Sequence, residues 1–285
     1  MEIYYIDGRF VSADQAVIPV NDLALLRGFG VFDLMRTYGG RPYFLDAHIK
    51  RLMRSAEHIG LVLPWSHETL CRKVLETLER NTLTEANIRI VVTGGPSPDF
   101  STPQGRPRLL ILVNPAPELP DQWYRQGVKI ISFRTQRFIP DAKSINYIPA
   151  TIAMQQAREC NAVEAVYVDR EDRVLEGTTS NLFAVIADEL VTPGEHILKG
   201  ITRQEILDLC DDLVPVALRE IAFGELLTAR EVFITGSNKG LVPVVQVDEH
   251  VIGNGRPGRL TQRLMARLKD HRRQFASEDT ATADE

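Results

Sequence analysis

The chain has 285 residues, 44% of them hydrophobic and 25% charged, proportions typical of a globular protein with one large domain or two smaller ones. Its formal net charge of −5 provides no attraction to nucleic acid or anionic lipid, so we expect neither as a partner. No apolar run is long enough to span a bilayer, and "MEIYYIDGRF" lacks the features of a secretory signal. Three dispersed cysteines, Cys71, Cys160 and Cys210, are interpreted as small buried hydrophobic residues of a cytoplasmic protein.

Two amphipathic helices and several strands are predicted in the first 115 residues. The helix at 45–60 has one apolar face, made by Ile49, Leu52, Met53, Ala56 and Ile59. The helix at 68–80 has another, made by Cys71, Val74, Leu75 and Leu78. "NIRIVVTGG" and "PRLLILVN" are typical of strands that end in turns. We therefore predict an N-terminal α/β domain over 1–115, followed by a proline-rich linker over 116–123.

A second domain is predicted over 124–276. Its strands are expected at "VKIISF", "AVYVD", "NLFAVI" and "VFITG". Its helices are expected from about 149, where proline suits the first turn, over 202–213, and from about 260. The remaining residues, 277–285, are polar and acidic, which favours disorder.

The segment "GNGRPG", residues 253–258, matches a dinucleotide-binding pattern by letters alone. That motif requires a preceding buried strand, a following helix and an acidic residue about 20 positions on, inside a βαβ unit. Fewer than thirty residues follow here, and none of them reads as a strand. We therefore interpret the segment as a turn before the last helix.

Three segments could contact a phosphate group, although each also has an ordinary structural interpretation. In "KGITRQEIL", Thr202 and Glu205 form a T-x-x-E capping box after Gly200, and the first turn of such a helix can bind an anion. In "FITGSNKG", a predicted strand ends in small residues that leave backbone amides accessible, namely Gly236, Ser237 and Asn238. Arg51 lies off the apolar stripe of its helix, so a solvated position is its default.

The pattern that joins these segments resembles the fold-type-IV (class IV) pyridoxal phosphate-dependent aminotransferases. The resemblance rests on "RGFGVFDLMRTYGGRPYFLDAHIKRLMRSAEHI", on "DAKSINY", on "LEGTTSNLF", on "GITR" and on "TGSNKGLVPV", which occur in the family's order over about 5–265. It implies a two-domain α/β (α+β) fold with the cofactor at the domain interface, and a homodimer in which each subunit completes the partner's site. It implies no metal.

The resemblance also implies roles for individual residues. Lys143 would hold pyridoxal 5'-phosphate as a Schiff base and exchange protons at the substrate Cα, giving ping-pong kinetics. Glu176 would keep the pyridine nitrogen protonated, and Arg51 would bind the phosphate. The other expected cofactor contacts are Tyr147, Ser180, Asn181, Gly200, Ile201, Thr202, Gly236, Ser237 and Asn238.

The substrates implied are an amino acid and a 2-oxo acid such as 2-oxoglutarate or pyruvate. The lysine loop reads K-x-x-N-Y, through Asn146 and Tyr147, as in D-amino-acid transaminases and aminodeoxychorismate lyases. However, "TGGPSPDFSTP" carries Asp99 and Ser101 where the well-known D-amino-acid enzymes place an arginine and a histidine. We therefore favour a D-amino-acid transaminase that lacks this usual carboxylate trap. The candidates for its substrate-carboxylate ligand are Arg27, Arg89 and Arg36, although structural pairing with Asp or Glu explains Arg36 or Arg89 equally well.

Three alternatives stay open. One is a branched-chain L-amino-acid aminotransferase, another is an aminodeoxychorismate lyase, and the third is a non-catalytic dimer that binds pyridoxal phosphate.

Overall fold

The computed structural model describes residues 1–277, and the chain forms two compact units, each of which combines helices with a β-sheet as predicted. The first unit contains residues 1–117, 141–146 and those from 272; the second contains 118–140 and 147–271. The units therefore differ from the contiguous domains of the prediction, because 141–146 and the end of the last helix group with the N-terminal residues. Of the predicted disordered tail, Ser277 ends a helix and 278–285 lie outside the described residues.

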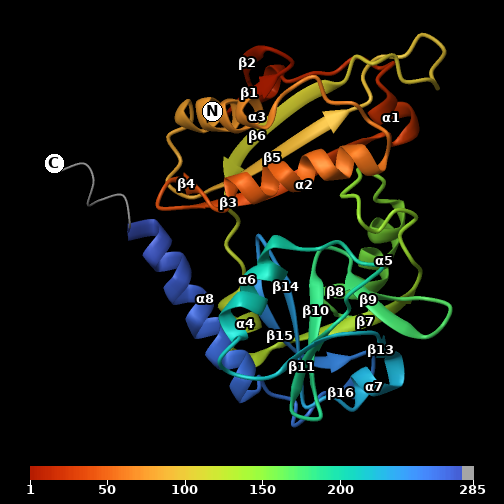
Figure 1. Ribbon diagram of the computed structural model, residues 1–285, viewed down its shortest axis with the longest axis vertical. Coiled ribbons are helices and arrows are strands. Elements are labelled where there is room, and N and C mark those ends of the chain that lie inside the picture. Colours follow the sequence, from red (N-terminus) through yellow and green to blue (C-terminus); the bar gives the residue numbers. More distant parts are fainter. Residues whose placement is uncertain (278–285) are drawn as a thin grey trace. The chain divides into compact units, whose positions relative to one another are not determined.

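The first unit is built on a β-sheet which, within the described chain, has six strands in the order β2-β1-β6-β5-β3-β4 (Figure 1). The strands are β1 Ile3–Ile6, β2 Arg9–Ser12, β3 Gly30–Tyr38, β4 Arg41–Pro42, β5 Ala86–Thr93 and β6 Arg108–Pro115. β1 and β2 form a hairpin through Asp7 and Gly8, which both have positive φ as a tight two-residue turn requires. β3 and β5 are antiparallel over seven residue pairs, from Gly30 opposite Thr93 to Arg36 opposite Asn87.

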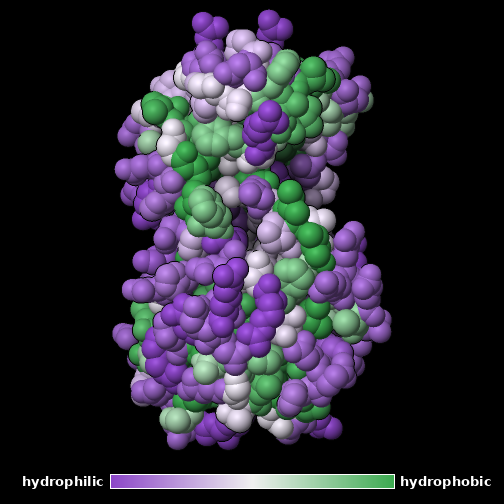
Figure 2. All heavy atoms as spheres, turned by 90° about the vertical axis from the view of Figure 1, so that its right-hand side faces the viewer, coloured by the Kyte–Doolittle hydropathy of each residue, from purple (hydrophilic) through white to green (hydrophobic). Residues whose placement is uncertain are grey.

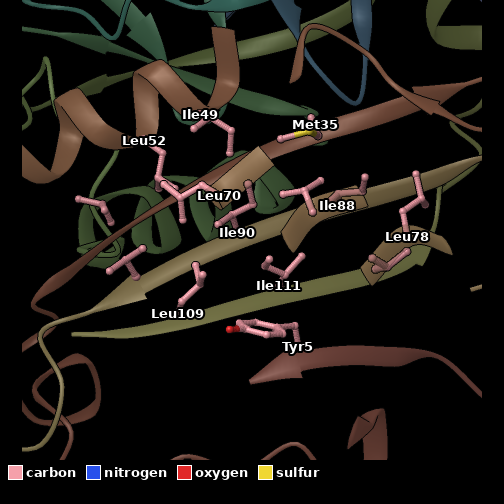
Figure 3. Packing of buried hydrophobic residues seen from close by; sticks show 14 of the residues in the cluster. Tyr5, Met35, Ile49, Leu52, Leu70, Leu78, Ile88, Ile90, Leu109 and Ile111 are labelled. Atoms are coloured by element: carbon pink, nitrogen blue, oxygen red, sulfur yellow. The ribbon is translucent and has the colours of Figure 1, made fainter. Parts of the chain in front are cut away.

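Helices α2 (Leu45–His58) and α3 (His67–Glu79) pack on this sheet, as Figure 3 shows for Ile49, Leu52 and Leu70 above the strand residues. The face predicted for α2 is confirmed. In α3, Val74 and Leu78 are buried as predicted, but Leu75 is exposed and Leu70 takes its place in the core. A 3-10 turn, η1 (Ala13–Gln15), and the short helix α1 (Leu23–Arg27) precede β3.

The second unit contains a larger sheet, which in the described residues has ten strands. Its order is β12-β11-β10-β14-β15-β7-β8-β9-β13, with β16 paired to β15. The strands are β7 Val128–Arg134, β8 Glu164–Val168, β9 Arg173–Gly177, β10 Asn181–Ile186, β11 Glu189–Thr192, β12 Val216–Leu218, β13 Ile221–Ala222, β14 Glu231–Gly236, β15 Gly240–Val247 and β16 His250–Val251. Every strand predicted in this half of the chain is present.

The helices of the second half are α4 Asp121–Gln126, α5 Ile148–Glu159, α6 Ile201–Cys210, α7 Phe223–Leu227 and α8 Arg259–Ser277 (Figure 1). α4 begins inside the predicted linker, so only its proline-rich part is without regular structure. The segment 253–258 is a turn before α8, as interpreted. The amides of Leu260 and Thr261 donate to the Glu231 carboxylate at 3.2 and 2.8 Å, so this helix terminus already has its anion.

The cysteine prediction was correct for Cys210 alone, since Cys71 is half-buried and Cys160 is exposed. On the face shown in Figure 2, hydrophobic residues gather in separate patches between hydrophilic ones. None of the helices described within 1–277 combines the length and the apolar character that crossing a membrane requires.

Candidate functional site

Lys143 lies in a short extended segment that pairs with β3. The amide of Phe32 donates to the Lys143 carbonyl at 2.9 Å, and the amide of Ile145 donates to the Gly30 carbonyl at 3.1 Å. The Lys143 amide also donates to the Ser55 hydroxyl of α2 at 3.1 Å. These contacts explain why 141–146 belong to the first unit. The Lys143 amine is therefore carried by backbone fixed at several points, and its Nζ lies 4.6 Å from the centre of the Phe32 ring.

Arg51, the predicted phosphate ligand, is buried on α2 rather than solvated. Its Nε and Nη2 each donate to Asp33 of β3 at 2.8 Å, and Nδ1 of His48 lies 2.6 Å from the same carboxylate. Burial alone would raise the pKa of the Asp33 carboxyl, but Arg51 and His48 outweigh it and hold the pKa well below its ordinary value. None of the hydrogen bonds within residues 1–277 uses Nη1 of Arg51, so this nitrogen can still donate to an anion.

Glu176 lies on β9 of the second unit and is almost fully buried. Its Oε2 accepts from the Leu198 amide at 3.0 Å, and its Oε1 accepts from Nε of Arg137 at 2.8 Å. Arg137 was missed by the sequence reading because 39 residues separate it from Glu176. Tyr167 of β8 was also missed: burial, and next the charge of Glu176, raise the pKa of its hydroxyl far above the ordinary value. A deeply buried carboxylate held by cationic and backbone donors suits an interaction with a protonated ring nitrogen.

The N-terminus of α6 differs from the predicted capping box. The N-cap residue is Gly200, which has no side chain to accept a capping hydrogen bond. Thr202 lies inside the first turn. Glu205 instead pairs with His271 of α8 at 3.1 Å. The helix also ends at Cys210, three residues earlier than predicted. The first-turn amides of α6 are thus left uncapped, which suits an anionic ligand.

Asn181 and Arg203 fix the backbone around this terminus. Asn181 Nδ2 donates to the Leu198 carbonyl at 2.8 Å, and a Cβ at Gly200 would lie 2.0 Å from Asn181 Oδ1, so only glycine fits. Arg203, which the sequence reading did not single out, is buried and donates from Nη2 to the Pro193 carbonyl at 2.9 Å. Burial lowers its pKa.

Gly236 ends β14, and Ser237 and Asn238 lie in the loop that leads to β15. Two buried polar atoms here, Oδ1 of Asn238 and Oγ1 of Thr235, have no hydrogen-bond partner in the described chain. Thr235 lies directly opposite Asn181 across the β10–β14 pair, so the two side chains lie on the same face of the sheet. This is the face on which Asn181 contacts Leu198. Unsatisfied buried polar atoms are rare in native proteins, and two in this region are consistent with a ligand.

Two other predicted contacts occupy different positions. Tyr147 is the N-cap residue of α5, whose first turn contains Pro149 as predicted. Ser180 follows β9 in the turn to β10, and its hydroxyl donates to Glu164 at 2.9 Å. The Ser180 hydroxyl therefore acts inside the protein rather than as a donor to a ligand.

The three candidate arginines for a substrate carboxylate have different surroundings. Arg89 on β5 is exposed, and its guanidinium lies 5.1 Å from the centre of the Phe32 ring, the same ring that Lys143 contacts. Nε of Arg36 lies 3.7 Å from Oε2 of Glu85, an ion pair of the kind that the structural interpretation expects. Arg27 ends α1 and donates to the Leu26 carbonyl beside it at 2.8 Å. Of the three, Arg89 is thus the one whose described contacts connect it to the surroundings of Lys143.

The loop that replaces the usual carboxylate trap is ordered by its own acid. The Asp99 carboxylate accepts from the Ser97 hydroxyl, the Ser101 amide, and the amide and hydroxyl of Thr102, at 2.6–2.9 Å. These hydrogen bonds, the one from Ser97 first, lower the pKa of Asp99. Asp99 therefore carries a negative charge in the segment where the well-known D-amino-acid enzymes have an arginine and a histidine.

Comparison with known proteins gives matches over nearly the whole chain. The family model of class IV amino-transferases matches residues 30–247. A putative branched-chain-amino-acid aminotransferase of Methanocaldococcus jannaschii is 36% identical over 278 residues, covering 94% of this chain and 96% of that protein. A D-alanine aminotransferase of Bacillus licheniformis is 31% identical over 270 residues, covering 93% and 95%. The branched-chain amino acid aminotransferase of Thermoproteus uzoniensis, solved with norvaline, superposes with a TM-score of 0.86 at 28% identity, covering 98% and 96%. Another solved branched-chain amino acid aminotransferase, determined with pyridoxamine 5'-phosphate, superposes with a TM-score of 0.86 at 27% identity. The superposition covers 97% of this chain and 94% of that one.

Proposed function

Since this chain belongs to the class IV aminotransferases, which use pyridoxal 5'-phosphate, we propose that it transfers the amino group of a D-amino acid to a 2-oxo acid. The observation that carries the proposal is the placement of Lys143 and Arg89 on one aromatic ring. An amine that reacts with a carbonyl and a cation that holds a carboxylate are the two groups that amino-acid recognition requires.

The side chains present fit the cofactor. The uncapped first-turn amides of α6 and the Nη1 donor of Arg51 each suit a phosphate group. Glu176 supplies the carboxylate that a protonated pyridine nitrogen needs. When bound, pyridoxal phosphate supplies an aldehyde that condenses with amines and a ring that accepts electron density from the substrate Cα.

Each residue then has a task of its own. Lys143 would hold the cofactor through Nζ, and its amine would take the proton from the substrate Cα and later return it. Asp33 and His48 hold Arg51 in one orientation, so that its guanidinium is already aligned for an anion. Arg137 and the Leu198 amide orient the Glu176 carboxylate in the same way.

The attachment is tested by reducing the holoenzyme with borohydride and mapping the labelled peptide. The label is expected on Lys143, and a Lys143→Ala variant should lose transamination while it still folds. A label on another side chain, or wild-type turnover by Lys143→Ala, would contradict the proposal.

Donor preference is tested with D-alanine and L-leucine, each paired with 2-oxoglutarate. The K-x-x-N-Y loop and the D-alanine aminotransferase relatives support D-alanine. A branched-chain L-amino acid is the second candidate, favoured by the 36% identity to the Methanocaldococcus protein. Faster turnover of L-leucine would establish that alternative.

Two further alternatives have their own tests. Release of pyruvate from aminodeoxychorismate would indicate a lyase. A bound cofactor whose absorption spectrum does not respond to any donor would indicate a non-catalytic dimer.

We further propose that two copies of the chain pair around α1. Val17, Val20 and Leu25 are 75%, 79% and 63% exposed, an unusual density of solvent-exposed apolar side chains in one short segment. Arg27 follows them and would then reach the partner's site. Light scattering during gel filtration measures the mass directly, and a monomer at micromolar concentration would contradict the pairing.

A further inference from the structure

Glu164, the first residue of β8, is a carboxylate with 1% exposure that the proposed reaction does not use. Burial alone would raise its pKa, but Lys239 and the surrounding donors outweigh that effect and keep the pKa below its ordinary value. The group is therefore a buried anion, which is stable only while its partners stay in place.

The partners of Glu164 come from two loops. Its Oε1 accepts from four donors of the β9–β10 turn, namely Thr178 Oγ1 at 3.1 Å, Thr179 N at 2.6 Å, Thr179 Oγ1 at 3.1 Å and Ser180 Oγ at 2.9 Å. Its Oε2 forms an ion pair with Nζ of Lys239, which lies in the β14–β15 loop. Lys239 also donates to the Thr179 hydroxyl at 3.0 Å.

The turn held in this way has little freedom to adopt another shape. The Gly177 amide donates to the Ser180 carbonyl at 2.8 Å, and a Cβ at Gly177 would lie 2.2 Å from the Ser180 hydroxyl and 2.8 Å from Glu164 Oε1. Glu176 precedes this turn and Asn181 follows it. The spacing between these two proposed cofactor residues therefore depends on the turn that Glu164 fixes.

Lys239 connects the second loop to the same anion. It follows Gly236, Ser237 and Asn238, the loop residues proposed to face the phosphate. Only 14% of its side chain is exposed, and its charge is compensated by Glu164, so it is not a carboxylate trap for substrates. One ion pair thus joins the loop proposed for the phosphate to the turn beside Glu176.

We infer that Glu164 and Lys239 are positioning residues for the cofactor, joining the β9–β10 turn and the β14–β15 loop so that Glu176, Asn181 and Ser237 hold their places before the cofactor binds. The inference rests on the proposed function and adds two residues to it that do not touch the cofactor themselves.

The test measures cofactor affinity rather than activity. Full-length apoprotein is titrated with pyridoxal phosphate, and separately with pyridoxal, which lacks the phosphate. In Lys239→Met the affinity for pyridoxal phosphate should fall by about tenfold or more, as expected for residues in one network. The affinity for pyridoxal should fall less, because the loosened loop carries the phosphate contacts. Lys239→Arg, which keeps the charge, should retain most of the affinity.

A double variant and a matched control separate positioning from general stability. Glu164→Gln should also lower the affinity for pyridoxal phosphate. The double variant Glu164→Gln/Lys239→Met should lose less affinity than the sum of the two single losses, because neither partner is then left charged and buried. Arg173→Met removes the partner of another buried carboxylate in the same unit, Asp169 at 2.7 Å. It should lower the melting temperature but leave both affinities unchanged.

Two outcomes would overturn the inference. One is wild-type affinity in a folded Lys239→Met protein, and the other is an equal loss for pyridoxal and pyridoxal phosphate. If Lys239→Met does not fold, the double variant decides: wild-type affinity for pyridoxal phosphate in a folded double variant contradicts the inference. A wild-type chain that fails to bind pyridoxal phosphate at Lys143 would instead contradict the proposed function.

Discussion

At the scale of single residues, the distinction among the arginines predicts different mutational effects. Arg89→Gln should raise the KM for amino-acid donors by about tenfold or more, because a charge-assisted contact to the substrate carboxylate is replaced by a neutral one. Binding of pyridoxal phosphate should not change. Arg36→Gln is the matched control: its guanidinium faces Glu85, so steady-state kinetics should show a much smaller change in KM. An equal effect of both substitutions would contradict the assignment of Arg89.

At the scale of secondary-structure elements, the entry into α6 depends on a glycine. Gly200→Ala places a Cβ 2.0 Å from Asn181 Oδ1, so the helix terminus or Asn181 must move. Such overpacking costs about 1–3 kcal/mol of the free energy of unfolding, and the displaced amides should also weaken cofactor binding. Gly224→Ala in α7 meets no atom within 4 Å and should be neutral or slightly stabilising. Denaturant unfolding and cofactor titration compare the two, and similar values for both variants would contradict the role of Gly200.

At the scale of the whole molecule, the buried cluster of Asp33, His48 and Arg51 predicts acid sensitivity. Burial, the largest cause, lowers the pKa of His48 below 6.5, and the charges of Arg51 and Lys143 act in the same direction. The unfolded chain therefore takes up a proton near pH 6.5 that the folded chain does not, so stability falls as pH drops below 6.5, by at most about 1.4 kcal/mol per pH unit from this group. Asp33, whose pKa is also lowered, adds a further loss at lower pH. Guanidinium unfolding at several pH values should show that the free energy of unfolding falls less steeply between about pH 6.5 and 5.5 in His48→Gln than in the wild type. An equally steep fall in both proteins would contradict the prediction.

The regular elements were largely predictable because their signals are local. The spacing of Ile49, Leu52 and Ala56 determines which face of α2 is buried, and Pro149 marks the first turn of α5 without reference to the rest of the fold. Predictions failed where a distant partner decides. Glu205 does not cap its helix because His271, 66 residues away, holds its carboxylate.

The candidate residues of the site were named from the resemblance, but their environments were not predictable. The burial of Arg51 follows from Asp33, which lies on a strand that periodicity did not single out. Lys143 is fixed by backbone pairing with Gly30 and Phe32, more than a hundred residues earlier, and no local pattern indicates such a pairing. Arg137, Glu164 and Lys239 act through other protein side chains, so motif reading gave no reason to single them out.

The path of the chain has a consequence for biosynthesis. The first unit takes residues 1–117 from the beginning of the chain, 141–146 from its middle and 272–277 from the end of α8, so the chain passes between the units four times. When the first 117 residues have been synthesised, the segment 141–146 that pairs with β3 has not yet been made. We expect that unit to mature only after nearly the entire polypeptide has emerged, and a fragment truncated at residue 117 to aggregate or remain incompletely folded.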